Sequence, residues 1–302
     1  MSATVRPMDE ESATTQLVSH RYGKSRVRLM RVTKHEARHD LDEWTVEVLL
    51  TGDFAEVFTH GDNTRILTTD TMKNTVYFLA RRSEAESIEA FAMELVDFLL
   101  SRNAQVNAVE VSVQSHLWKR LTIHGEPYPT AFMKGSEERG TTHASWAQGG
   151  TFTLCSGFTE MTVLKTAQSA FSGYIKDELT TLPETTDRLF GTSVTAEWSF
   201  TAEAISNRIA FAKVRRHLRE RMIETFARHH SLSVQQTLYA MAEAALEHTT
   251  AIDEVFLRMP NKHNLLVDLD RFGSDNPNHI FVPTDEPHGI IEATVRRTPR
   301  EG

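Results

Sequence analysis

Apolar and polar residues alternate along many short stretches of this chain, a pattern typical of strands that bury one face. Residues 27–32 form the first such stretch and residues 44–50 the second, with the polar residues 33–42 between them. Further strand-like stretches predict strands at residues 65–68, 75–80, 109–113, 117–123, 152–156, 161–166, 194–200, 254–259 and 265–269.

Helical spacing of apolar residues interrupts the strands in each half of the chain. Residues 83–101 place apolar side chains every three or four positions, and Ser83 with Glu86 has the spacing of a capping box at a helix start. In the second half, residues 202–229 and 233–248 predict two more helices.

The order of strands, helices and strands occurs twice, which indicates an internal duplication. Thr68-Thr69-Asp70 resembles Thr185-Thr186-Asp187, and residues 109–111 before His116 resemble residues 255–257 before His263. Each half is therefore predicted to be an antiparallel sheet with helices on one face, in the α+β class. The length of 302 residues fits two domains. We expect them at 18–148 and 149–302, after a disordered polar arm at 1–17.

Composition and charge exclude several classes of partner. A net charge of −8 and a pI near 6.0 argue against nucleic acid or an anionic membrane surface as the main partner. No run of about 18 apolar residues occurs, the first residues lack a signal-peptide core, and the last residues lack a peroxisomal Ser-Lys-Leu address. A cytoplasmic bacterial protein is the simplest interpretation.

The single cysteine, Cys155, cannot form a disulfide framework or a cysteine zinc site within one chain. It lies in an apolar stretch, which favours a small buried side chain in a reducing compartment.

The segment His35-Glu36-Ala37-Arg38-His39 matches H-E-x-x-H, the signature of zinc hydrolases. That chemistry needs a helix, because both histidines must share one face. Here the flanking stretches predict strands, so we expect a solvated hairpin connection and keep zinc hydrolysis only as an alternative.

Two polar segments of the first half are candidates for chemistry. Lys24 precedes the first strand; most lysines are solvated, and this one becomes a candidate base only if it is shielded from water. Thr69 and Asp70 lie in a threonine-rich cluster between predicted strands, where hydroxyl and backbone groups could meet a polar ring. Turn formation and helix capping would explain the same residue types.

The second half adds an arginine and a glutamine. Arg188 either forms a salt bridge with Glu184 or Asp187, or grips a planar anion with its guanidinium fork. Gln235 stands at a predicted helix start, where it is either simply exposed or offers a donor and an acceptor to a purine-like edge.

Pro260-Asn261-Lys262-His263 is the most unusual local combination, placed between two predicted strands. Asn261 and His263 share a face if the segment is extended. A histidine at such a strand edge is either structural or catalytic, and the segment alone leaves both open.

Together these segments resemble the urate oxidase (uricase) family over nearly the whole chain, from Tyr22 to Val295. The motifs that carry the resemblance occur in the family's order and spacing: Tyr22-Gly23-Lys24, Thr68-Thr69-Asp70, Lys73-Asn74-Thr75, residues 161–166, residues 180–188, Val234-Gln235, residues 259–263 and Gly289-Ile290-Ile291.

The resemblance implies a chain of two tandem tunnelling-fold domains, each an antiparallel sheet with paired helices on one face. It implies a homotetramer around a central tunnel, with active sites between subunits. It also implies that urate and dioxygen react, without a metal or an organic cofactor, to 5-hydroxyisourate and hydrogen peroxide.

The resemblance also assigns substrate-binding roles. Phe171 stacks on the flat purine, and Arg188 and Gln235 hold the two ends of urate. Val234 and Ile291 shape the pocket wall.

Three further positions complete the implied substrate site. Thr69 and Asp70 enter from the neighbouring subunit, Asp70 through its main-chain N–H. Asn261 lies over the ring plane where dioxygen or water waits.

Lys24, Thr69 and His263 then resemble a proton relay. Urate at neutral pH is a monoanion that reacts slowly with triplet oxygen, and loss of a second proton makes it a better one-electron donor. A lysine can take the proton, a threonine hydroxyl can pass it on, and a histidine exchanges protons near neutral pH.

The chain departs from the family pattern beside these positions, not on them. Phe171 is followed by Ser-Gly-Tyr, Met259 replaces the usual leucine, and Pro183 interrupts residues 180–188. These departures bear on rate and specificity. The alternative within the same fold is an inactive protein that binds purines or pterins.

Overall fold

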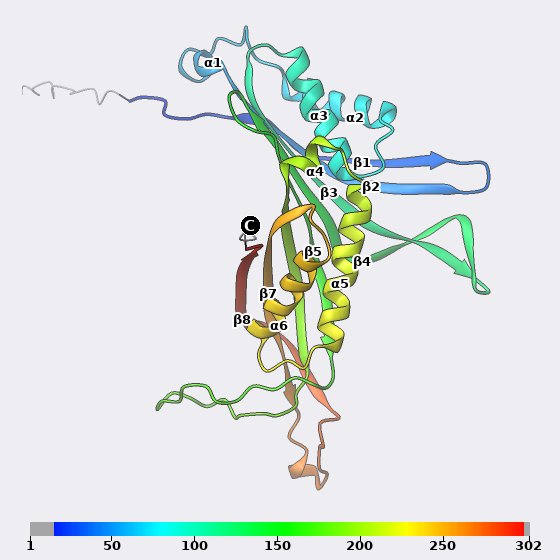
Figure 1. Cartoon of the computed structure of the whole chain (residues 1–302), viewed down its shortest axis with the longest axis vertical. Coiled ribbons are helices and arrows are strands. Elements are labelled where there is room, and N and C mark those ends of the chain that lie inside the picture. Colours follow the sequence, from blue (N-terminus) through cyan, green and yellow to red (C-terminus); the bar gives the residue numbers. More distant parts are fainter. Residues whose placement is uncertain (1–14, 299–302) are drawn as a thin grey trace, which may run out of the picture.

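A computed structural model describes residues 15–298, so most of the expected N-terminal arm, residues 1–14, lies outside the described residues. Eight strands form one antiparallel sheet in which chain neighbours pair throughout, from β1 to β8 (Figure 1). The strands are β1 (Tyr22–Lys34), β2 (His39–Gly52), β3 (Val106–Ile123), β4 (Glu126–Ala147), β5 (Thr153–Lys165), β6 (Phe190–Phe200), β7 (Ile252–Leu266) and β8 (Phe281–Arg296).

The helices lie between the second and third strand of each half. They are α1 (Ala55–Thr59), α2 (Thr69–Arg82), α3 (Ile88–Arg102), α4 (Ala202–Ser206), α5 (Phe211–Arg228) and α6 (Val234–Glu247). A short 3-10 helix at Asp270–Phe272 lies between β7 and β8. Figure 1 shows the long helices on one side of the sheet. No helix in residues 15–298 is both long and apolar enough to cross a membrane.

Alternation along the strands decides which side chains enter the core. Val46, Val48 and Leu50 of β2 are fully buried against the helices, and the residues between them are only half-buried. The predicted α+β class, with an antiparallel sheet and helices on one face, is confirmed.

The two halves repeat each other in geometry as well as in order. The first strand of each half has a bulge with a left-handed residue, Arg26 in β1 and Glu160 in β5, both at φ 57°. Three residues earlier each strand has a glycine. A Cβ on Gly23 or Gly157 would meet a carbonyl oxygen of the neighbouring strand at 1.8 or 2.0 Å. The duplication predicted from the sequence is therefore present in the fold.

The predicted strands at 65–68 and 75–80 are wrong, because residues 65–68 form a turn and loop and residues 69–82 form α2. Thr68 caps this helix by accepting a hydrogen bond from the backbone N–H of Thr71 at 3.1 Å. Met72, Val76 and Ala80 then recur every four residues as its buried stripe. Thr69 and Asp70 thus open a helix and do not lie between strands.

The predicted capping box at Ser83 and Glu86 is also wrong. Ser83 ends α2, and Ser87 is the residue that caps α3, accepting from the N–H of Ala90 at 3.1 Å. Ser83, which the pattern assigned to the start of the second helix, is thus the residue at which the first helix ends.

Several strands are longer than the pattern predicts. The stretches 109–113 and 117–123 are one strand, β3; 152–156 and 161–166 are one bulged strand, β5; and 254–259 and 265–269 are one strand, β7. β4 and β8 were not predicted, because neither alternates regularly in apolar residues. The single helix predicted at 202–229 is two, α4 and α5, with left-handed Arg208 between them.

The two halves are joined through β4 and β5, which pair from Arg139–Thr159 to Ser145–Thr153. The expected domain boundary at 148/149 falls in the turn between these strands. Buried Glu89 of α3 reinforces the junction, because its carboxylate accepts from Arg215 of α5 at 2.6 Å and from Ser156 of β5 at 3.0 Å.

The close approach at the repeated glycines predicts a large stability effect. Gly157→Ala places a methyl group within 2.0 Å of the Ala196 carbonyl, so the strands must separate and the free energy of unfolding should fall by about 3 kcal/mol. Gly140→Ala is the matched control, because its new Cβ would lie 3.7 Å from its nearest neighbour and should cost less than about 1 kcal/mol. Urea unfolding measures both; equal losses would contradict the close approach.

Candidate active site

A cavity of about 400 Å³ lies at one end of the second half. Its walls come from the β5–β6 connection, from the end of β7 and from the β7–β8 connection, which Figure 1 shows at the bottom of the view. Four of the residues singled out in the sequence line this cavity: Phe171, Arg188, Asn261 and His263. Leu182 and Pro183 of the motif at residues 180–188 also line it, as do Asn278 and Phe281, which the sequence analysis did not single out.

Arg188 is half-buried and points over the ring of Phe171, with the guanidinium carbon 5.3 Å from the ring centre. Of the two alternatives for Arg188, the salt bridge is absent among residues 15–298, because Glu184 pairs with Lys176 and Asp187 accepts from the N–H of Ser169. Its buried Nε has no hydrogen-bond partner there, and burial lowers the pKa of Arg188. A desolvated cation without a carboxylate favours an anionic ligand.

The backbone fixes Phe171 in place. Phe171 and Thr185 exchange two hydrogen bonds, at 2.8 and 3.0 Å, which join the two ends of the β5–β6 connection. Tyr174 stacks on the Phe171 ring at 4.9 Å between ring centres. One face of the phenylalanine is therefore supported from within the same loop.

The start of α6 lies next to this loop. Ser231 accepts from the N–H of Ala170 at 2.7 Å, three residues before the helix begins at Val234. Val234 is buried and Gln235 is exposed, while the neighbouring Gln236 bonds the backbone N–H of Leu232. Neither Val234 nor Gln235 lines the cavity.

The β7–β8 pairing places two further candidates. Ile291 of β8 is opposite Met259, and Asn261 is opposite Gly289. Asn261 and His263 both lie inside the continuous strand β7, so the expectation of a segment between two strands is wrong. Both side chains nevertheless reach the same cavity, whereas Ile291 does not line it.

Lys24, Thr69 and Asp70 form a separate group in the first half of the chain. Tyr22 of β1 donates to the Leu67 carbonyl at 3.0 Å, which holds the start of α2 beside Lys24. The Lys73 ammonium, and more weakly that of Lys24, lowers the pKa of the Asp70 carboxyl. None of the three lines the cavity, so one described chain does not bring the predicted relay together.

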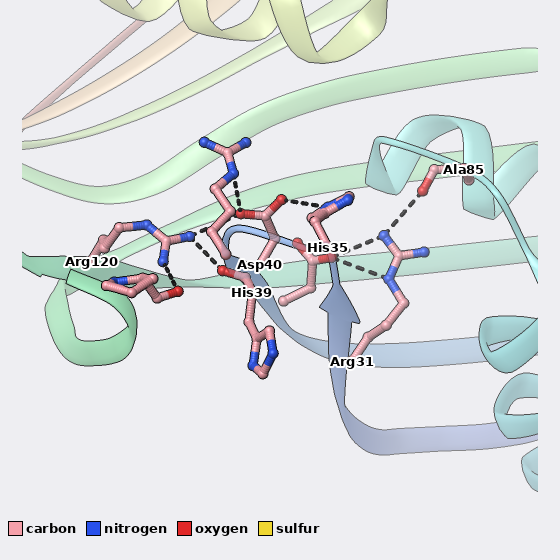
Figure 2. A network of polar contacts seen from close by, with 9 residues as sticks. Arg31, His35, His39, Asp40, Ala85 and Arg120 are labelled. Carbon is pink, nitrogen blue, oxygen red and sulfur yellow. Dashed lines mark hydrogen bonds and ion pairs between the residues drawn. The ribbon is translucent and has the colours of Figure 1, made fainter. Parts of the chain in front are cut away.

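The H-E-x-x-H segment forms the connection of the β1–β2 hairpin, as its flanks predict (Figure 2). The His35 N–H bonds the Arg38 carbonyl at 2.9 Å, and the His35 ring contacts Asp40 at 3.0 Å. His39 offers its backbone carbonyl to Arg120, while its ring points away from this network. The two histidines therefore lack the common helical face that the zinc signature requires. Among residues 15–298, no group of three or more His, Cys, Asp or Glu side chains could hold a metal ion.

Comparison with known proteins agrees with the fold. The sequence profile of the Uricase family matches residues 20–145 and 154–292. The uricase of Arthrobacter globiformis is 38% identical over 95% of this chain and 93% of its own length, and that of Dictyostelium discoideum is 35% identical over 93% and 98%. The crystal structure of the Arthrobacter globiformis uricase has a TM-score of 0.87, with 37% identity over 96% of this chain and 98% of that chain.

Two tandem antiparallel units with helices on one face, matched over both units by the relatives, define an α+β protein of the tunnelling fold. This chain belongs to the uricase family.

Proposed function

We propose that this chain is a urate oxidase, an oxidoreductase that converts urate, dioxygen and water into 5-hydroxyisourate and hydrogen peroxide without a metal or an organic cofactor. The observation that carries the proposal is Arg188, a half-buried cation without a carboxylate partner in the described chain, placed over an aromatic ring in the cavity wall. The relatives from Arthrobacter globiformis and Dictyostelium discoideum are uricases, which supports the same reaction.

Recognition of urate would use charge, shape and hydrogen bonds together. Phe171 would stack on the purine, Arg188 would complement its negative charge, and Gln235 would read the lactam groups at the other end. Val234 and Ile291 would close the wall, and Asn261 would lie over the ring where dioxygen or water binds.

Two helix starts would add backbone donors. In α2, Thr71 N–H is taken by the Thr68 cap, and in α6, Gln236 N–H is taken by Ser233. The first N–H groups of a helix have no acceptor within it, so Asp70 and Val234 each keep one for a ligand. The positive end of a helix dipole also suits an anion.

The proton relay would run through Lys24, Thr69 and His263. Lys24 and Thr69 would remove a proton from bound urate monoanion, after which one electron passes to dioxygen and the radical pair joins at C5 as a hydroperoxide. Hydrogen peroxide then leaves, and water activated by the same groups adds to C5. His263 would hold and return the proton that this sequence requires.

The separation of the two groups supports a site shared between subunits. Lys24, Thr69 and Asp70 of one chain would face the cavity of another, in a homotetramer around a central tunnel. Exposed apolar residues near the cavity support such a contact, among them Leu265, Leu266, Val282 and Ile290.

The remaining assignments concern organisation and location. Domains at 18–148 and 149–302 fit the repeated geometry, with the boundary in the β4–β5 turn. Burial raises the pKa of the Cys155 thiol, which makes it poorly reactive and compatible with a cytoplasmic location.

The test of the proposed function follows urate by ultraviolet absorbance while oxygen uptake and peroxide release are recorded, in chelator and without added cofactor. We expect urate, oxygen and peroxide in a ratio of about one to one to one from the stoichiometry, at a turnover of about 1–10³ s⁻¹. Urate binding without oxygen uptake would instead assign an inactive purine-binding protein. No binding at all would reject the urate site.

The relay predicts that Lys24→Ala or Thr69→Ala lowers kcat about 10²–10⁴-fold, with KM changed less than about threefold, because proton transfer is lost while urate still binds. Steady-state kinetics and urate binding at equilibrium measure the two effects. Lys119→Ala, at an exposed position on β3, is the control that should retain wild-type kinetics. Parallel losses in kcat/KM and in binding affinity would make these residues ligands and not proton carriers.

A site shared between chains predicts complementation of two inactive variants. In mixed tetramers of Lys24→Ala and His263→Ala chains, a cavity from the first variant meets an intact lysine from the second. Random pairing should then restore about a quarter of the wild-type activity. The measurement is turnover after co-expression with two affinity tags and tandem purification. Mixed tetramers as inactive as either parent would place Lys24 and His263 in the same site-forming chain.

A further inference from the structure

Lys165 occupies a core-facing position at the end of β5. The preceding core-facing residues are Met161 and Val163, and Lys165 is opposite buried Phe190 of β6. An apolar residue would continue this pattern, so a lysine here needs partners for its ammonium group.

Those partners are the last carbonyls of α5. Lys165 Nζ donates to the carbonyl oxygen of His229 at 2.5 Å and lies 3.4 Å from that of Phe226. It also lies 5.8 Å from the centre of the Phe226 ring. A cation at the negative end of a helix satisfies carbonyls that have no partner within the helix. Burial lowers the pKa of Lys165, and the negative charge of Asp187 raises it. Asp187 therefore stabilises the ammonium form, which donates these bonds.

The chain that follows α5 connects this contact to the cavity. Ser231 donates from its N–H to the Gln168 carbonyl at 3.0 Å and accepts from the Ala170 N–H at 2.7 Å. Phe171 directly follows Ala170 on one side of this bridge. On the other side, α6 begins three residues after Ser231, and Gln235 is its second residue. The end of α5, the Phe171 segment and the start of α6 are thus one hydrogen-bonded unit, held to β5 by Lys165.

We propose that Lys165 is a positioning residue, which fixes the end of α5 against β5 and thereby sets the spacing between Phe171 and Gln235. It contacts no ligand itself, since it does not line the cavity. Its effect on turnover rests on the proposed function, but its effect on the local backbone does not.

Hydrogen exchange tests the backbone effect without urate. In Lys165→Met, peptides covering residues 166–174 and 229–236 should exchange about tenfold faster than in the wild type, because the bridge at Ser231 opens more often. Lys165→Arg keeps a cation that can donate to the same carbonyls, so it should exchange like the wild type. A peptide within residues 40–50 of β2 is the internal reference. Unchanged exchange in both loop peptides would overturn the proposal.

Kinetics test the consequence for the site. Lys165→Met should raise KM for urate about 5- to 20-fold while kcat falls less than about threefold, because binding geometry is loosened and the relay groups are untouched. Lys213→Met on the exposed face of α5 should leave both constants unchanged. Ser87→Ala removes the cap of α3, so it should lower thermal stability without raising KM.

The possible outcomes are separable. If Lys165→Met does not fold, Lys165→Gln retains a neutral N–H donor group and should show the same exchange pattern in weaker form. If Ser87→Ala raises KM as much as Lys165→Met, general destabilisation explains the effect and the proposal fails. A wild-type protein without urate turnover rejects the proposed function, while hydrogen exchange still decides the role of Lys165.

Discussion

The pairing of β4 with β5 is the interaction on which the rest of the structure depends. Without it, two four-stranded units would each expose an additional edge. Buried Glu89 makes separation still more costly, because its carboxylate lies in the first half and its charged partner, Arg215, in the second. Losing one partner of a buried ion pair leaves an uncompensated charge, which destabilises by about 3–5 kcal/mol.

One continuous sheet also fixes where the candidate residues lie. The group at Lys24 belongs to the first strand and second helix of one half, and the cavity belongs to loops at the end of the other half. None of Lys24, Thr69 and Asp70 lines the cavity of its own chain, so the proposed site would have to be completed by another chain.

The sequence predicted the fold where apolar spacing is regular and failed where local and tertiary signals compete. The helix at residues 233–248 and the strand at 44–50 were found because their buried stripes are uninterrupted. Residues 75–80 contain the Val, Tyr and Phe typical of strands, yet Met72, Val76 and Ala80 form a helical stripe that a short window does not include. β4 and β8 lack an apolar rhythm, because much of their length is exposed in the chain on its own.

For the site, sequence motifs identified residues that the fold brings to one cavity, Phe171 and Arg188 with Asn261 and His263. Spacing alone could not establish this, because about 70 residues separate Arg188 from Asn261 and only strand pairing relates them. The sequence also could not show whether Arg188 forms a salt bridge. Two carboxylates lie close in the chain, and each proves to be engaged elsewhere.

The bulge at Arg26 has a consequence for the side of the sheet on which Lys24 lies. Lys24 and Val27 are three residues apart but face Val48 and Val46, which are two apart on the core side. In β5 the equivalent bulge keeps Phe158 and Met161 in the core. The inserted residue acts as a phase shift: without it, Lys24 would point to the opposite side, away from the start of α2. Lys24 therefore occupies the place that a buried phenylalanine fills in the other half, and one copy of a duplicated core position has become available for an amine.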